Sequence, residues 1–347
     1  MIYTPRNILV TGGAGFIGCN FVRYMLANDP KAHIFNLDKL SYAGSLDNLK
    51  NLPDESRHTF VQGDICDREL IDHLLHEHEI DTVVHFAAES HVDNSISGPE
   101  VFVKTNVMGS FTLLDAARNY WLREKGWGER GCRFHHISTD EVYGTLQADD
   151  SAFSETTSYA PNSPYSASKA ASDHLVRAYF HTYGLPVTTT NCSNNYGPYQ
   201  HGEKFIPTVI RSCLTDEPIP VYGDGSNIRD WLYVEDHCRG IDVVLRRGSV
   251  GEVYNIGGCN EWSNIDICRL ICSLMDEMQP IEGSYSDLIA FVSDRPGHDW
   301  RYAINAFKMS NEFGWRPAES FETGVKRTLQ WFLDSSEYMT DRNFKDE

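Results

Sequence analysis

The sequence contains no apolar run that approaches the roughly 18 residues needed to span a membrane, and no repeats or low-complexity tracts. It is also poor in positive charge: 30 Lys and Arg stand against 49 Asp and Glu, which gives a formal net charge of −19. Such a charge disfavours binding to nucleic acid or to an anionic membrane surface. A phosphorylated ligand would therefore need a few cationic side chains gathered in one place.

Regularly spaced cysteine pairs are missing too. The nine cysteines are odd in number and scattered, so we interpret them as reduced thiols. His73, His76 and His78 cluster in a way that could suggest a metal, but we favour a solvated helix end and expect no metal. The first expected strand begins within a few residues of Met1, which argues against a secretion signal. We therefore expect a cytoplasmic protein.

The N-terminal segment contains a strand, a glycine turn and a helix. The apolar run Ile8–Val10 precedes Gly12, Gly15 and Gly18, and a helical pattern covers Phe16–Leu26. In such a unit the glycines permit the turn, the approach of a pyrophosphate and close helix–strand packing, while the helix N-terminus attracts phosphate. The spacing is GxxGxxG rather than GxGxxG, so an ordinary strand-to-helix turn remains the alternative at this point.

A second strand strengthens the nucleotide interpretation. The run His33–Leu37 ends at Asp38, which lies 20 residues after Gly18. A carboxylate at this place can accept hydrogen bonds from the adenosine ribose hydroxyls and would repel a 2′-phosphate. We therefore predict NAD rather than NADP as the cofactor.

Strand-like and helical patterns alternate through the first half of the chain, which predicts a parallel sheet with helices on both faces. Right-handed crossovers then give a Rossmann-like doubly wound α/β fold. The expected strands are Ile8–Val10, His33–Leu37, Thr59–Gln62, Thr82–Phe86, Phe134–Ser138 and Val187–Thr190. The expected helices between them include Arg68–Glu77, Glu100–Arg118 and Ser166–Tyr183.

The rhythm changes after about Asn191, where Pro and Gly become frequent. Short isolated strands are expected at Ile219–Tyr222 and Val253–Ile256, and a final helix at Phe321–Leu333. We predict an NAD-binding domain over residues 1–190 that carries the catalytic residues. Residues 191–347 would form a smaller α/β domain that mainly binds substrate, with some crossing of the chain between the two.

Tyr165 and Lys169 stand four residues apart, on one face of an expected helix. A phenol with a reference pKa near ~10 is a poor base at neutral pH. We expect the nearby ammonium, aided by a positive nicotinamide ring, to lower the pKa of Tyr165. YxxxK alone also fits a solvated helix face. Downstream of the glycine turn it resembles the extended branch of the short-chain dehydrogenase/reductase superfamily.

Two adjacent carboxyls, Asp140 and Glu141, follow Thr139 at the end of the fifth expected strand. The hydroxyl could bind a reacting oxygen, and the two acids can act as proton donor and acceptor if the site separates their pKa values. Epimerisation at one carbon needs only the tyrosine and a hydroxyl, so the pair indicates a further proton transfer such as elimination of water. A polar loop or helix cap is the alternative for this segment.

Eight segments together resemble the dTDP-glucose 4,6-dehydratases, a lyase family of deoxysugar (rhamnose pathway) and nucleotide-sugar metabolism. They span nearly the whole chain: residues 11–18, 37–44, 87–93, 138–144, 165–169, 191–198, 223–231 and 294–299. The motifs at 139–141 and 295–299 are the most specific. Asn94 and Trp300 depart from the family pattern, and neither is a catalytic position.

The resemblance implies roles for particular residues. Catalysis would use Thr139, Asp140, Glu141, Tyr165 and Lys169. NAD would be bound by Gly12, Gly15, Phe16, Ile17, Gly18, Asp38, Lys39, Asp64, Ile65, Ala87, Ala88, Ser90, Thr105, Tyr165, Lys169 and Asn195. The nucleotide sugar would be bound by Ser90, Thr139, Asn194, Lys204, Phe205, Pro220, Tyr222, Arg229, Asn264, Arg295 and His298. Lys204, Arg229, Arg295 and His298 would be the local cations that a phosphorylated ligand needs.

The resemblance also implies a three-step reaction. Tyr165 would deprotonate the C4 hydroxyl while C4 passes hydride to NAD⁺. Glu141 would then remove the C5 proton as Asp140 protonates the leaving C6 hydroxyl, and hydride would return to C6. The alternatives are a nucleotide-sugar 4-epimerase or decarboxylase of the same fold, and a non-catalytic dinucleotide sensor. The nucleotide base stays open.

Two expected helices are apolar on more than one face: Glu100–Arg118, with Val101, Val103 and Phe111, and Ser166–Tyr183. A helix packed on one sheet needs only one apolar stripe. We therefore predict a homodimer with a four-helix interface, as the resemblance also implies.

Overall fold

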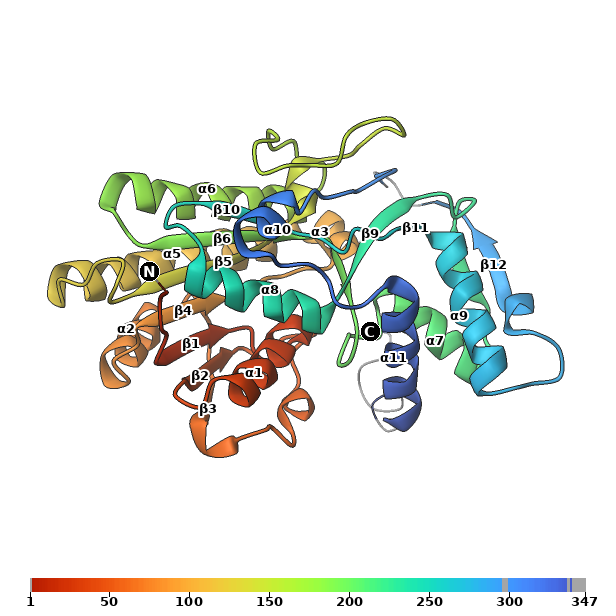
Figure 1. The fold of residues 1–347 in the computed structure, drawn as a ribbon, viewed down its shortest axis with the longest axis horizontal. Helices are drawn as coiled ribbons and strands as arrows, with labels where there is room; N and C mark the ends of the chain where they lie inside the picture. Colours follow the sequence, from red (N-terminus) through yellow and green to blue (C-terminus); the bar gives the residue numbers. More distant parts are fainter. Residues whose placement is uncertain (1, 295–298, 336–337, 339–347) are drawn as a thin grey trace.

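The structure is a computed structural model that describes residues 2–294, 299–335 and 338. A large sheet covered by helices on both faces occupies one side of the molecule, and a smaller region with two short sheets occupies the other (Figure 1). Across the described ranges, no helix is both long and apolar enough to cross a membrane.

Seven parallel strands form the large sheet, in the order β10-β6-β5-β4-β1-β2-β3. They are β1 (Asn7–Thr11), β2 (His33–Asp38), β3 (His58–Gln62), β4 (Thr82–His85), β5 (Arg133–Thr139), β6 (Val187–Cys192) and β10 (Val253–Ile256). The order reverses beside β1, so the carboxyl ends of β1 and β4 border a crevice, the usual ligand site of such sheets. The predicted doubly wound α/β fold is confirmed.

Helices cover the two faces of this sheet. One face packs against α1 (Phe16–Asn28), α8 (Val234–Arg247) and the short α10 (Phe307–Phe313). The other packs against α2 (Arg68–Glu77), α5 (Ser110–Ala117) and α6 (Pro164–Tyr183), with α3 (Val92–Ser97) and α4 (Pro99–Phe102) beside α6. Buried strands are therefore sandwiched between two apolar helix layers, as a parallel sheet requires.

The helix predicted over Glu100–Arg118 is not one α-helix. It divides into α4, a π-helical segment Val103–Gly109, α5, and a second π-helical segment Arg118–Glu124. The predicted helix is therefore present, but its hydrogen-bond register alternates. An apolar stripe recurs in α and π turns alike, so periodicity does not report the register. Short 3₁₀ turns lie at Leu46–Leu49, Glu55–Arg57, Asp140–Tyr143 and Tyr285–Leu288.

Helix α6 begins two residues earlier than predicted. The Ser163 hydroxyl accepts the Ser166 N–H at 3.0 Å, and the Ser166 hydroxyl accepts the Ser163 N–H at 3.1 Å. Pro164 occupies the first helical position, where its missing N–H costs nothing. This reciprocal cap fixes the first turn of the helix that carries Tyr165 and Lys169.

The smaller region contains a three-stranded sheet, β11 (Glu261–Ser263), β9 (Ile228–Tyr233) and β7 (Asn194–Tyr196), and a two-stranded sheet, β8 (Ile219–Tyr222) and β12 (Ile289–Val292). Helices α7 (Phe205–Thr215), α9 (Asn264–Met278) and α11 (Phe321–Asp334) enclose its core. In Figure 1 these helices lie together, away from the large sheet.

Two strands predicted as isolated are paired. β8 lies parallel to β12, and β10 lies parallel to β6 at the edge of the large sheet. The chain therefore returns to the first region after it has entered the second. Pairing over a long sequence separation leaves no mark on a four-residue apolar run, which is why these strands looked isolated. The domain boundary at residue 190 stays a prediction.

Candidate active site

A cleft of about 560 Å³ lies at the carboxyl ends of the large sheet and extends to the smaller region. Apart from Arg295 and His298, every site residue that we predicted lines this cleft. Arg295 and His298 lie outside the described residues. The fold thus brings into one cavity residues that are scattered over most of the sequence.

The glycine turn at one end of the cleft fits a dinucleotide pyrophosphate. Gly12 has φ +74°, and a Cβ there would lie 2.6 Å from the Ala87 nitrogen. A Cβ on Gly18 would collide with the Gly12 carbonyl oxygen. Helix α1 starts after Gly15 without a side-chain cap, and its first residues, Phe16, Ile17 and Gly18, line the cleft. Such a helix start binds phosphate oxygens.

Asp38 ends β2 beside this turn, as predicted. Its carboxylate accepts N–H groups from Ala14 at 2.9 Å and Leu40 at 2.8 Å, and burial raises its pKa. Because a carboxylate has about four acceptor positions, two backbone bonds leave room for ribose hydroxyls. Next to it, Lys39 pairs with Asp64 at 2.9 Å, which holds Asp64 at the rim of the cleft.

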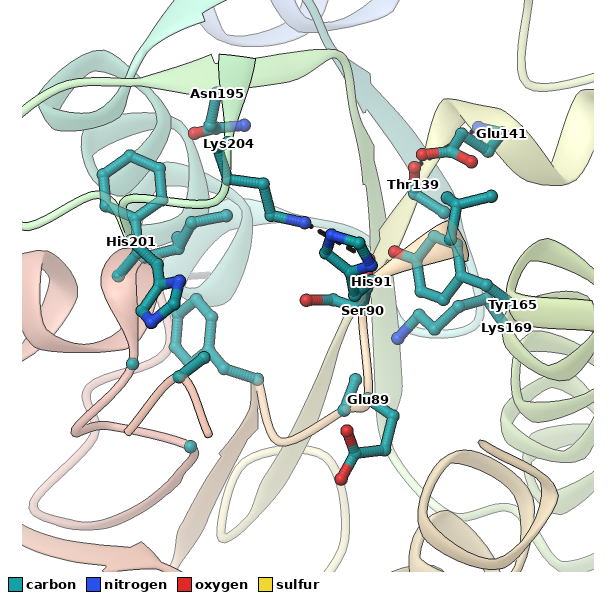
Figure 2. Close-up of a pocket in the computed structure, with 18 of the residues that line it drawn as sticks. Glu89, Ser90, His91, Thr139, Glu141, Tyr165, Lys169, Asn195, His201 and Lys204 are labelled. Atoms are coloured by element: carbon teal, nitrogen blue, oxygen red, sulfur yellow. Dashed lines mark hydrogen bonds between the residues drawn. The ribbon is translucent and has the colours of Figure 1, made fainter. Parts of the chain in front are cut away.

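Tyr165 and Lys169 project from α6 toward the end of β5. The Lys169 ammonium donates to the Ile137 carbonyl at 2.7 Å, and Figure 2 shows the Tyr165 ring between Lys169 and Thr139. Both side chains are buried. The tyrosine thus lies within reach of a hydroxyl and of the helix's own ammonium, as the YxxxK spacing predicts.

The expected low pKa of Tyr165 is wrong for the chain by itself. Burial raises the pKa of Tyr165 well above its ordinary value, the negative charge of Glu141 raises it further, and a hydrogen bond with Thr139 only partly opposes them. Burial also lowers the pKa of Lys169. The error came from weighing the ammonium without the desolvation of the phenolate. A positive nicotinamide ring would act in the opposite sense.

The two acids of the predicted pair have different surroundings. The Asp140 side chain is 1% exposed, and its Oδ2 has no hydrogen-bond partner within the described residues. Burial, then the charges of Glu141 and Asp230, raise the pKa of Asp140 well above its ordinary range, against the opposing charge of Arg229. Glu141 is only partly buried and lines the cleft. Asp140 is therefore suited to donate a proton.

Two of the four predicted cations fall within the described residues, and both line the far part of the cleft. The Arg229 guanidinium donates to the carbonyls of Ile228 at 2.7 Å and Asp299 at 2.8 Å and lies over the Tyr302 ring. Lys204 reaches across toward Ser90, whose carbonyl lies 3.4 Å from its ammonium (Figure 2). In a chain of charge −19, these are the local positive groups that a diphosphate requires.

Comparison with known proteins agrees with this geometry. The family model described as GDP-mannose 4,6 dehydratase matches residues 9–328. The chain is 53% identical to a dTDP-glucose 4,6-dehydratase of Shigella flexneri over 341 residues, which covers 96% of this chain and 94% of that one. The chain belongs to the GDP-mannose 4,6 dehydratase family, among its dTDP-glucose 4,6-dehydratases.

Solved structures of the family superpose closely. The dTDP-glucose 4,6-dehydratase DesIV of Streptomyces venezuelae, solved with NAD and TYD bound, has a TM-score of 0.86 and 45% identity, and the match covers 96% of this chain and 98% of that one. A UDP-glucose 4-epimerase of Thermotoga maritima, solved with UDP-glucose, has a TM-score of 0.82 and 27% identity, covering 95% and 99%. The fold is therefore shared with epimerases, and the site residues must separate the two activities.

Several residues of this dehydratase-family cleft escaped the sequence prediction. Glu203 lies between His91 at 3.6 Å and His201 at 3.8 Å, and the Arg229 guanidinium lies over the Tyr302 ring. Asp230, which is buried and does not line the cleft, raises the pKa of Asp140 by its charge. Glu203 and Asp230 are sequence neighbours of the predicted Lys204 and Arg229. Adjacency to a predicted cation was the signal that could have found them.

Proposed function

We propose that this chain is an NAD-dependent hydro-lyase that converts dTDP-glucose into the 4-keto-6-deoxy sugar nucleotide. The observation that carries the proposal is the buried Asp140 carboxyl next to Glu141, in the same cleft as Tyr165 and Lys169. A 4-epimerase or a dinucleotide sensor has no use for this second acid/base pair. The 53% identity to a dTDP-glucose 4,6-dehydratase supports the same substrate.

NAD fits the glycine turn and Asp38, and when bound it accepts a hydride from the sugar and later returns it. Tyr165 takes the proton of the C4 hydroxyl, and the Thr139 hydroxyl orients that oxygen. Lys169, held on the Ile137 carbonyl, keeps a positive charge beside the phenolate. Burial of this group of side chains excludes water, which strengthens each of these electrostatic interactions.

Elimination falls to the acid pair. The ketone at C4 acidifies the C5 proton, and Glu141 removes it from the cleft side. Asp140, whose pKa burial raises, gives its proton to the C6 hydroxyl, which leaves as water. The hydride first taken from C4 returns to C6, and a proton added at C5 completes the product.

The decisive experiment incubates the purified protein with dTDP-glucose, without added NAD, in deuterated water. We expect the 4-keto-6-deoxy product, with one solvent deuterium at C5 and the C4 hydrogen of the substrate at C6. A product that lacks solvent label at C5 would contradict the elimination, and conversion to the C4 epimer would establish an epimerase. Parallel incubations with UDP-, GDP- and CDP-glucose compare kcat/KM and test the thymine preference.

Assembly as a homodimer is part of the proposal. Val101, Val103, Met108 and Phe111, spread along the segment from α4 to α5, are 40–53% exposed, and a cluster of exposed large apolar side chains often marks an interface. Light scattering at micromolar concentration should give twice the mass of the chain, and Phe111→Glu should lower it. A monomeric mass for the unaltered chain would sink the idea. The cytoplasmic location stays a prediction.

A further inference from the structure

A buried carboxylate that the proposed chemistry does not use lies one helical turn behind Lys169. Asp173 is 6% exposed and sits on the face of α6 that meets β5. Its Oδ1 accepts from the His136 Nε2 at 3.0 Å, and its Oδ2 accepts from the Ser138 hydroxyl at 2.8 Å and the Tyr159 hydroxyl at 2.9 Å. Three donors aimed at one carboxyl stabilise its anionic form.

The same three residues of β5 hold both Lys169 and Asp173. The Ile137 carbonyl accepts from the Lys169 ammonium, while its neighbours His136 and Ser138 donate to Asp173. The strand then continues directly into the segment 139–141 that carries the hydroxyl and the acid pair. One patch of hydrogen bonds thus fixes the lysine, the carboxylate and the start of the acid segment relative to one another.

The Lys169 ammonium has little else to balance its charge. It is fully buried, burial lowers its pKa, and the nearby Asp173 is the largest influence that raises it. Residues four apart on a helix lie one above the other, so the two charges face the same strand. An ammonium out of water persists only where an opposite charge compensates its lost hydration.

We propose that Asp173 is a positioning residue whose buried negative charge keeps Lys169 in its ammonium form and ties α6 to the catalytic end of β5. The proposal rests on the role given to Lys169 in the proposed function. It goes further in assigning the counter-charge of that lysine to a residue that touches neither sugar nor cofactor.

The other titratable groups around Lys169 and Asp173 have pKa values shifted toward their neutral forms, or can be removed by substitution. Burial holds the pKa values of His136 on β5 and His85 on β4 well below their ordinary range, and it raises that of Cys192 on β6. The pKa values of Tyr143 and Tyr159, which also face the carboxylate, are raised for the same reason. His174, the exposed neighbour of Asp173, acts on its charge as well and is removed in the control His174→Gln.

The test follows the protonation of Lys169 directly. The protein is labelled with ¹³Cε-lysine, and the Lys169 resonance is assigned by its loss in Lys169→Met. In Asp173→Asn we expect this resonance to titrate at lower pH than in the unaltered protein. Glu277→Gln, which removes an exposed carboxyl on α9, should leave it in place. An unchanged titration in Asp173→Asn would overturn the proposal.

The rate of C4 oxidation gives a second reading. Each unit by which the Lys169 pKa falls below the working pH lowers the ammonium fraction about tenfold. Formation of bound reduced nicotinamide from dTDP-glucose should therefore slow in Asp173→Asn over the pH range in which the resonance titrates, with KM little changed. Asp173→Glu should restore part of the rate. Because the resonance needs no substrate, failure of the proposed function would leave this test standing.

The Asp173→Asn protein could fail to fold, so a further test uses Tyr159→Phe, a variant that keeps the Asp173 carboxylate. Burial raises the pKa of Asp173 to about 6, and the Tyr159 hydroxyl opposes that rise. The Lys169 resonance of the unaltered protein and of His174→Gln should therefore show a small inflection near that pH, as Asp173 takes up a proton. Tyr159→Phe, which loses one donor, should move the inflection to higher pH. Absence of the inflection would overturn the proposal.

Discussion

Two interiors of the molecule differ in character: the middle strands of the large sheet, and the core that α7, α9 and α11 enclose in the smaller region. Strands β5 and β6 of the large sheet are buried along their whole length, yet most of their residues are polar: Arg133, His135, His136, Ser138, Thr139, Thr188, Thr189, Thr190 and Asn191. The core that α7, α9 and α11 enclose packs large apolar side chains instead, among them Tyr196, Ile206, Val209, Trp231, Ile267, Phe321, Val325, Leu329 and Phe332.

The difference follows what each interior has to do. Buried polar groups must find hydrogen-bond partners, so His135 is bonded to Thr188 at 2.8 Å, and Asp173 to Ser138. Such bonds are directional and fix side chains in one arrangement, which proton transfer requires. An apolar core is held by shape and burial, which suffices to support the segments of the smaller region that line the cleft.

The largest effects on rate should come from substituting the reacting groups at the polar strand ends of the large sheet. Tyr165→Phe should strongly slow oxidation at C4, because no base remains for that hydroxyl. Glu141→Gln should still oxidise C4 but lose C5 proton removal, so reduced nicotinamide should accumulate on the enzyme. Both losses should be about 10²–10⁴-fold, measured by single-turnover absorbance. Equal behaviour of the two variants would contradict the division of labour.

Substitutions in the apolar core of the smaller region should lower the free energy of unfolding rather than the rate of the reaction. Phe321 is fully buried in the core of the smaller region, so Phe321→Ala should lower the free energy of unfolding by about 3–5 kcal/mol. Turnover per folded molecule at saturating substrate should change little. Denaturant unfolding measures the first and active-site titration the second. Phe307→Ala is the control, because Phe307 is 68% exposed and should cost little.

An intermediate effect is expected at the cofactor end. Asp38→Ala removes the ribose acceptor and also the partner of the Ala14 and Leu40 N–H groups. NAD binding to the stripped protein should weaken by roughly 1.5–3 kcal/mol, as measured by calorimetry. The discrimination against NADP should shrink as well. Undiminished preference for NAD in this variant would show that another residue makes the choice.

The smallest effects should come from two helix caps, one in each region. Ser163 caps α6 and Ser263 caps α9 by accepting N–H groups of the first turn. Replacing either serine by alanine should cost about 1 kcal/mol of unfolding free energy. Only Ser163→Ala should also slow C4 oxidation, because α6 carries Tyr165. Slower oxidation in Ser263→Ala would mean that the two regions are less separate than their interiors suggest.

Local sequence patterns predicted the elements that carry their own signal, such as a cap followed by an amphipathic helix or a short apolar strand. Arg68–Glu77 was placed at its observed bounds, since Asp67 caps it and the pattern is strongly amphipathic. Strand β9 was missed because Arg229 and Asp230 interrupt its apolar residues, although both are buried in the fold. Its polar residues have their partners on distant segments, and no local pattern records that.

For the candidate site, the sequence indicated which residues lie together but not how their surroundings shift their pKa values. Helical spacing placed Tyr165 beside Lys169, but the pKa of Tyr165 depends on burial by several elements at once. The roles of the acid pair stay a prediction, although the two neighbours do differ in burial: Asp140 is buried and Glu141 is only partly buried. Asp173 was overlooked although it repeats the spacing of the YxxxK pair.

The position of β10 has a consequence for how the chain is made. β6 ends at Cys192, but the strand that completes the sheet beside it begins only at Val253. A chain that emerges from the ribosome N-terminus first must therefore expose one edge of β6 while residues 193–252 are synthesised. An open edge of this kind is a template for wrong pairing. Folding of the large sheet should thus finish only after residues 193–256 have been translated.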